Sequence, residues 1–301
     1  MKKVSFMIVA LMGMMAASCG NESDELSNEK TVEQSQLVPV RVHVEGFSLS
    51  QEEFSGAQTR AAEDVADYND VNAITLAFYS GSTEVGKITQ LKSDGSTYTT
   101  FGEFGLSLPM GSYTMVALAY YTNENSVLTL TSPTEASFNV RARETFAYTQ
   151  SVTISNTNAV DISATLNRIV SMLTVKSSDG KTEDVSNVRM TFSAGGKDFN
   201  PTTGLAITTT GLTNTVRNSA DVGATSTSST MFFLNTDEQN INVTIETLDA
   251  DGNTLLSKTV NNVPFQRNRV TKLTGAMYTN EALSGTFQVE TAWLDEYSAN
   301  F

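Results

Sequence analysis

The sequence predicts an all-β protein made of two β-sandwich domains in series. Short segments rich in Val, Ile, Thr, Tyr and Phe recur along the chain with turn residues between them, which is typical of sandwiches or barrels. The pattern contains no convincing long amphipathic helix. Aromatic residues make up only 8% of the chain while Thr, Ser, Asn and Val are abundant, which favours an extracellular β protein over a cytosolic enzyme. A length of 301 residues suits two ordinary domains.

The first residues have the organisation of a secretion signal. Lys2 and Lys3 precede an uncharged stretch from Val4 to Met15, and small residues follow up to Ser18. The uncharged stretch is too short to cross a bilayer, which takes about 20 apolar residues. We therefore predict a lipoprotein-type signal peptide at residues 1–18.

Cys19 directly follows these small residues and completes a lipobox. In this arrangement the chain is cut between Ser18 and Cys19, the thiol takes a diacylglycerol, and the new amino terminus is acylated, for instance by palmitate. Several acyl chains give the stable membrane anchoring that one chain does not. The alternative is a chance cysteine behind an ordinary secretory signal. Cys19 is the sole cysteine, so no disulfide can form, and the covalent lipid is the only attached group we expect.

The charge of the chain excludes two classes of partner. The net charge is −14, and loss of the signal with its two lysines makes it about −16. Such a surface repels nucleic acid and anionic lipid. Residues 19–36 are polar and acidic without apolar periodicity, and we interpret them as a tether that holds the folded part away from the membrane.

The N-terminal domain, residues 37–157, opens with an alternating strand. Its apolar positions, which form one face, are Val38, Val40, Val42 and Val44. Pro39 cannot donate to a sheet ladder, which suits an edge strand or a first strand. We therefore expect a half-buried strand at the start of the domain.

An exposed loop is expected at residues 48–70, where the residues are small, polar and acidic. Arg60 and Ala61 lie in the middle of this loop, where proteases reach a chain easily. The sequence therefore offers a candidate processing site between these two residues.

Further strands follow in two sets. Those of the first set are expected at residues 74–79, 86–91, 113–121, 127–131 and 146–154, and those of the second at 162–175, 188–193, 231–234, 241–248, 255–260 and 269–278. Asp179-Gly180 and Asp251-Gly252 are expected at hairpin turns. We place the domain boundary in the polar stretch 155–158, so the C-terminal domain spans residues 158–301.

The last expected strand is also amphipathic. Its alternating set, separated by Gln288, Glu290 and Ala292, is Phe287, Val289, Thr291 and Trp293. Both ends of the folded region are thus predicted to be amphipathic strands beside polar segments.

The residues that most enzymes need are missing. His43 is the only histidine and lies on the polar side of the first strand, so a Ser-His-Asp or Cys-His arrangement would depend on it alone. A zinc site of the His/Cys type is excluded because Cys19 is the only cysteine. We expect no metal site and no catalytic residue.

Four features together resemble a known family. They are the lipobox, the strand before Thr59-Arg60-Ala61, the segment 166–175 (Leu-Asn-Arg-Ile-Val-Ser-Met-Leu-Thr-Val) and the segment 262–275 (Asn-Val-Pro-Phe-Gln-Arg-Asn-Arg-Val-Thr-Lys-Leu-Thr-Gly). Across nearly the whole chain they are similar to the Bacteroidales fimbrillins, the subunits and anchor proteins of type V pili. The resemblance implies two tandem transthyretin-like, Greek-key β-sandwich domains. It also implies export as a lipoprotein and display on the outer membrane.

The resemblance further implies a way of assembling. In polymerising fimbrillins an arginine-specific protease removes the first strand, and a neighbouring subunit's strand fills the groove. In this chain the cut would follow Arg60, the displaced strand would be Val38 to Val44, and the candidate donor strand would be Phe287 to Trp293. A supplied strand satisfies the uncovered side chains and backbone groups, and a head-to-tail contact of this kind builds a filament.

Three readings of the role follow. The first is a structural subunit of a pilus that supports adhesion, in a homo- or heteropolymer, with a host or bacterial surface as its ligand. An uncleaved, lipid-anchored fimbrial anchor subunit is the second, and a surface glycan-binding lipoprotein is the third. A carboxylate-based glycosidase ranks last, because no pair of carboxylates stands out.

Overall fold

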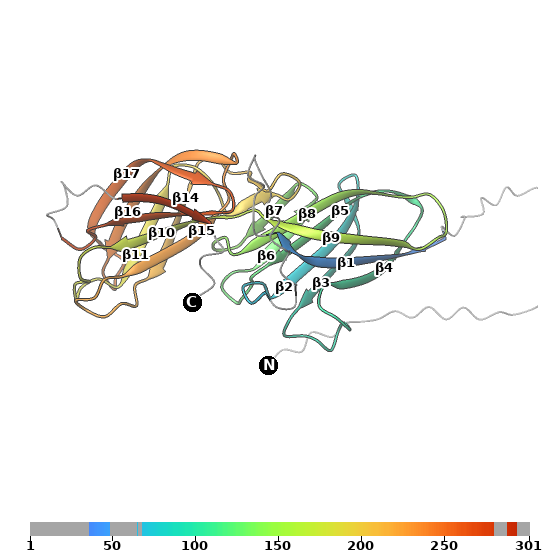
Figure 1. Cartoon of the computed structure of the whole chain (residues 1–301), viewed down its shortest axis with the longest axis horizontal. Helices are drawn as coiled ribbons and strands as arrows, with labels where there is room; N and C mark the ends of the chain where they lie inside the picture. Colours follow the sequence, from blue (N-terminus) through green and yellow to red (C-terminus); the bar gives the residue numbers. More distant parts are fainter. Residues whose placement is uncertain (1–35, 49–64, 66–67, 280–287, 294–301) are drawn as a thin grey trace, which may run out of the picture. The chain divides into compact units, whose positions relative to one another are not determined.

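The computed structural model describes residues 36–48, 65, 68–279 and 288–293, and every regular element in these ranges is a β-strand (Figure 1). The strands up to the middle of the chain are β1 (Val38–Ser48), β2 (Ala73–Ser80), β3 (Thr83–Leu91), β4 (Glu103–Leu108), β5 (Gly111–Tyr120), β6 (Leu128–Ser132), β7 (Glu135–Phe138), β8 (Thr145–Ile154) and β9 (Val160–Arg168). The later strands are β10 (Ser171–Ser177), β11 (Asn187–Phe192), β12 (Asp198–Asn200), β13 (Leu205–Ala206), β14 (Leu212–Arg217), β15 (Thr227–Phe232), β16 (Glu238–Leu248), β17 (Thr254–Gln266), β18 (Arg269–Gly275) and β19 (Gln288–Trp293). The all-β prediction is confirmed.

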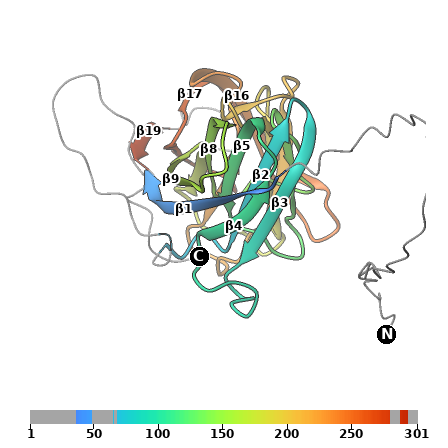
Figure 2. The same ribbon diagram turned by 90° about the vertical axis from the view of Figure 1, so that its right-hand side faces the viewer.

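A seven-stranded sheet carries the first strand. Its order is β3-β2-β5-β8-β9-β1-β4, and Figure 2 shows that the sheet is strongly curved. This curvature brings the two edge strands, β3 and β4, close together. Gln90 of β3 donates a hydrogen bond to the Glu103 carbonyl at 2.6 Å and accepts one from the Gly102 amide at 2.8 Å. The sheet thereby encloses a core to which β1, β2, β4, β5, β8 and β9 all contribute side chains.

The outer face of the same sheet is also covered. A small sheet in the order β13-β12-β7-β6 packs there through Phe138 and Phe199. The Phe199 ring stacks on Phe233, which directly follows β15, with centroids 4.2 Å apart. Strands β2 and β5 are therefore buried on both faces, which explains why their sequences are almost continuously apolar. Because β7 comes from the first half of the chain and β12 from the second, this sheet joins the two halves.

The second half is a sandwich of two four-stranded sheets. One has the order β15-β10-β18-β19 and the other β14-β11-β16-β17. Their facing side chains form a separate core, in which Phe232 lies 4.5 Å from Phe192 and 5.1 Å from Phe265 between ring centroids. Aromatic pairs at these distances stabilise beyond the area that they bury.

The structure corrects the expected strand at 162–175. This segment forms two strands, β9 and β10, which belong to different sheets and are separated by Ile169 and Val170. The polar stretch 155–158, expected as the domain boundary, connects the antiparallel neighbours β8 and β9, and β9 still pairs with the first sheet. Ile169 and Val170 are 5% and 0% exposed, so the chain stays apolar where it passes between the sheets and its composition conceals the break.

One of the two expected hairpin turns is likewise wrong. Asp251-Gly252 joins the antiparallel pair β16 and β17, as expected. Asp179-Gly180 instead follows β10 and leads toward β11, which lies in the opposite sheet.

Candidate functional site

The first strand lies between two partners. Strand β1 pairs antiparallel with β4 and parallel with β9, so its backbone is bonded on both sides. We call the space between β4 and β9 that β1 fills the β1 slot. The residues predicted to face inward, each 0% to 3% exposed, are Val38, Val40, Val42 and Val44. Their predicted burial is confirmed.

The end of β1 carries an aromatic side chain into the core. A bulge between Val44 and Gly46 shifts the register, so that Phe47 points inward three residues after Val44 instead of two. Phe47 is fully buried, and its ring lies 4.5 Å from Phe146 and 5.3 Å from Tyr68 between centroids. The aromatic cluster of Phe47, Tyr68 and Phe146 therefore fixes the C-terminal end of the strand.

A buried ion pair lies beside this cluster. The Arg168 guanidinium donates through Nε to Glu144 Oε1, and the two side chains are 3% and 6% exposed. A second donor of Arg168 contacts the Tyr68 hydroxyl at 2.7 Å, and its guanidinium carbon lies 5.1 Å from the centre of the Phe146 ring. The ion pair, Tyr68 and Phe146 thus form one packed unit with the end of β1.

The charges of this unit are held in place by each other. Burial raises the pKa of the Tyr68 hydroxyl, and the Glu144 carboxylate raises it further, so Tyr68 stays protonated and donates to Glu144 at 3.2 Å. Burial by itself would lower the pKa of Arg168, but the contact with Glu144 outweighs it and the pKa is raised. Arg168 therefore remains a cation inside the protein, and a buried cation of this kind needs the negative charge of Glu144 beside it.

The same arginine reaches the second half of the chain. Arg168 donates to the side-chain oxygen of Asn268 at 3.1 Å, and the Asn268 amide donates to the carbonyl of Val170 at 2.9 Å. Asn268 has a φ of 60°, in the left-handed region that asparagine tolerates. The segments 166–175 and 262–275, which carried the family resemblance, therefore meet at this point.

Two acidic residues flank β1 on its outer face. Arg41 lies 3.4 Å from Asp161 of β9, and His43 pairs with Glu103 of β4. All four side chains are about half exposed or more. The single histidine is thus an exposed strand residue, as the alternation predicted.

A polar clamp holds the chain just before the final strand. The Asp179 carboxylate accepts hydrogen bonds from the amides of Met277, Tyr278 and Thr279 at 2.7 to 3.0 Å. Partial burial would raise the pKa of Asp179, but the amide donors outweigh it and lower the pKa. The Tyr278 hydroxyl contacts Asn218 at 2.6 Å inside the protein. Sequence reasoning took Asp179 for a turn residue and missed this role.

The final strand β19 lies at the edge of a sheet. It pairs antiparallel with β18 from Thr274↔Gln288 to Arg269↔Trp293. Three of the four predicted donor positions belong to it, namely Val289, Thr291 and Trp293. Phe287 lies outside the described residues, as do the predicted lipidation and processing residues Ser18, Cys19, Arg60 and Ala61.

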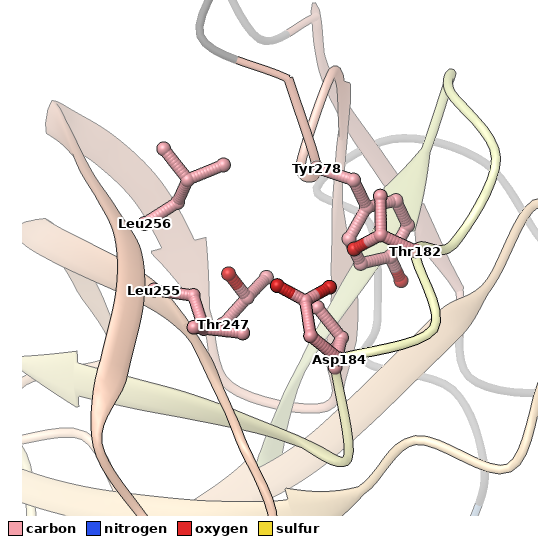
Figure 3. Close-up of a pocket in the computed structure, with 7 residues that line it drawn as sticks. Thr182, Asp184, Thr247, Leu255, Leu256 and Tyr278 are labelled. Atoms are coloured by element: carbon pink, nitrogen blue, oxygen red, sulfur yellow. The ribbon is translucent and has the colours of Figure 1, made fainter.

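A shallow hollow of about 230 Å³ lies in the second half of the chain. Figure 3 shows Thr182, Asp184 and Tyr278 facing Leu255 and Leu256 across it. In the part of the chain that the structure describes, no three His, Cys, Asp or Glu side chains are grouped as metal ligands. Among the same residues no helix is long and apolar enough to span a bilayer.

Comparisons with known proteins agree with this architecture. One family model, described as a family of unknown function (DUF6562), matches residues 40–300. A search of curated protein sequences found no match. Similar solved structures include the fimbrial anchor protein Mfa2 of Porphyromonas gingivalis, at 10% identity and a TM-score of 0.50 over 86% of this chain and 98% of that one. A candidate adhesin of Bacteroides ovatus is similar at 12% identity and a TM-score of 0.51, over 80% of this chain and 88% of that one.

These structural likenesses show the fold. The resemblance to the fimbrillins, noted from the sequence, is confirmed at that level.

Proposed function

The chain belongs to the DUF6562 family and has the fold of a fimbrial protein, and on these premises we propose that it is a cell-surface fimbrial subunit. It is exported as a lipoprotein through Cys19, and a cut after Arg60 removes the first strand. A strand from a neighbouring subunit then fills the β1 slot, and the filament supports adhesion.

The burial of β1 is the observation that carries this proposal. Four valines on alternate positions are almost completely inaccessible, and each contributes about 1.5–3 kcal/mol by burial. Loss of β1 also unpairs the facing backbone groups of β4 and β9. Binding of a replacement strand to the opened protein would therefore be strongly favourable, because it buries the apolar side chains and pairs the backbone groups again. This free energy is the driving force that strand exchange needs.

A second candidate role is an uncleaved anchor subunit. It is supported by the position of β1 inside the sheet, with partners on both sides, and by Phe47 packed beside the buried ion pair. A strand held so extensively suits a protein that keeps it. The similar protein Mfa2 is itself named as a fimbrial anchor.

The amino terminus of the surface protein distinguishes the two roles. We expect fibres sheared from the producing cells to contain a chain that begins at Ala61. The variant Arg60→Gln should remain in the membrane fraction with lipidated Cys19, while the matched variant Lys30→Gln, which leaves Arg60 in place, should be processed normally. If the surface protein always begins at lipidated Cys19 and Arg60→Gln changes nothing, the polymerising role is wrong and the anchor role remains.

A further inference from the structure

We propose that the β1 slot accepts a strand from a different protein rather than the C-terminal strand of a second copy of this chain. The fitting strand has small β-branched side chains at four alternate positions, a basic side chain between the second and third, and an aromatic side chain three residues after the fourth. This inference rests on the proposed function, in which β1 leaves its slot.

The shape of the slot sets the first requirement. Val38, Val40 and Val42 are 0% exposed, so neighbouring side chains enclose them completely and a larger side chain at these positions would have to displace those neighbours. Val44 also has close neighbours on both sides. It pairs with Ala164 of β9, and Gly102 lies next to it on the other side. A Cβ added to Gly102 would lie 3.6 Å from the Val44 Cβ and 3.5 Å from Val65 Cγ1. An aromatic ring in a position built for valine overpacks such a core.

The rim of the slot sets the second requirement. Asp161 and Glu103 belong to β9 and β4, so both remain when β1 departs. They face Arg41 and His43 of β1, and an incoming strand with a basic side chain at the Arg41 position restores the pairing with Asp161. Because the groups are exposed, their effect is on the choice of partner more than on affinity.

The chain's own last strand fails the first requirement. Phe287 and Trp293 begin and end its alternating set, and they are six residues apart, as are Val38 and Val44. Every register that places this set in the slot therefore puts at least one of the two aromatic residues in a valine position.

The last strand also fails the second requirement. When its four alternating residues fill the four valine positions, Glu290 takes the place of Arg41 whichever way the strand runs. Glu290 then faces Asp161 across the pair, and like charges on neighbouring strands destabilise a sheet. The sequence that the slot demands is consequently not the one that this chain can donate.

Competition between short peptides tests the inference. The full mature chain receives a recognition site for a specific protease at positions 58–62 and is cut there. Three fluorescein-labelled peptides are then titrated into the cut and uncut protein and followed by anisotropy. They are residues 38–47, residues 286–295, and residues 286–295 with Phe287→Val, Glu290→Arg and Trp293→Val.

We expect the first and third peptides to bind the cut protein at least about tenfold more tightly than the second. Equal binding of the native peptide 286–295 would overturn the inference and leave strand exchange intact. If even peptide 38–47 does not enter the cut protein, strand exchange itself is wrong and the inference fails with it.

A charge reversal isolates the rim. The third peptide is compared with the same peptide carrying Glu at position 290. In the cut variant Asp161→Lys the preference for Arg over Glu should reverse, while the exposed control Asp221→Lys should keep the original preference. An unchanged preference in Asp161→Lys would show that the rim does not select the strand.

Discussion

Arg168 and Glu144 form an ion pair inside the protein, with side chains 3% and 6% exposed, at the end of β9 where the chain passes to the second half. Tyr68 and Asn268 complete the hydrogen bonds of the guanidinium from the two sides. The pair therefore connects the aromatic cluster at the end of β1 with the turn between β17 and β18. This buried pair has a measurable consequence for the stability of the fold.

Replacing Glu144 by Gln should destabilise the protein by about 3–5 kcal/mol, because Arg168 is left as an uncompensated buried charge. Urea unfolding followed by circular dichroism measures the loss. The control is Glu84→Gln, which breaks the exposed pair with Lys87 and should cost about 0–1 kcal/mol. Equal effects of the two variants would contradict the structural role of the buried pair.

Truncating Phe47 to Ala should cost about 3–5 kcal/mol, because a large ring leaves a fully packed aromatic cluster. The loss should appear as faster amide exchange along β1, measured by mass spectrometry. Leu37→Ala, one residue before the strand and 58% exposed, should leave the exchange of β1 almost unchanged. Unaltered exchange in Phe47→Ala would mean that the aromatic cluster does not hold the strand.

The substitution Gly102→Ala should destabilise the protein by about 1–3 kcal/mol, because Gly102 has a φ of +95°, in the left-handed region that strains any residue with a side chain. Gly95→Ala is the matched control, because its added Cβ would meet nothing within 4 Å. Thermal unfolding of both variants measures the difference. A Gly102→Ala protein as stable as Gly95→Ala would mean that the left-handed backbone at Gly102 does not strain a side chain.

The clamp at Asp179 should make stability depend on acid. Its pKa in the folded protein is lowered by the amides of Met277 and Tyr278, so the contribution is complete above the unfolded pKa, near 4, and is lost as the pH falls through the folded value. Asp179→Asn should lose about 1 kcal/mol at pH 7, allowing for screening by solvent, and should lose less at pH 3.

The exposed turn residue Asp251 provides the control for this measurement. Asp251→Asn should change stability little at either pH, and urea unfolding at pH 7 and pH 3 gives both values. If Asp179→Asn behaved as Asp251→Asn does, the clamp would have no part in holding the segment before β19.

The sequence predicted the local elements better than their long-range partners. The alternation of the four valines identified the buried face of β1, because the two faces of a strand separate apolar from polar residues. The burial of Phe47 could not be predicted in this way, because the bulge that turns it inward is not visible in the alternation of apolar and polar residues. The pairing of Arg168 with Glu144 joins positions on different elements, and a single sequence contains no signal for such a contact, although one arginine within an apolar segment was a hint.

The break between β9 and β10 was hidden for a different reason. A chain that passes from one buried sheet to another remains apolar throughout, so only the tertiary structure shows the change of direction at Ile169. The small sheet that combines β7 and β12 was similarly inaccessible to prediction, because its pairs depend on how the two halves meet.

The covalent link between β1 and the core has a consequence for any exchange of strands. Val65 and Tyr68 are buried against the same core as β1, and residues 49–64 connect the two. While that connection is intact, β1 competes for its slot at the millimolar effective concentration typical of a short tether. A cut in the connection would change none of the contacts of β1, yet it would turn an intramolecular equilibrium into a bimolecular one. The protease would thus lower the effective concentration of β1 at its slot. Only after the cut would an incoming strand compete with β1 on equal terms.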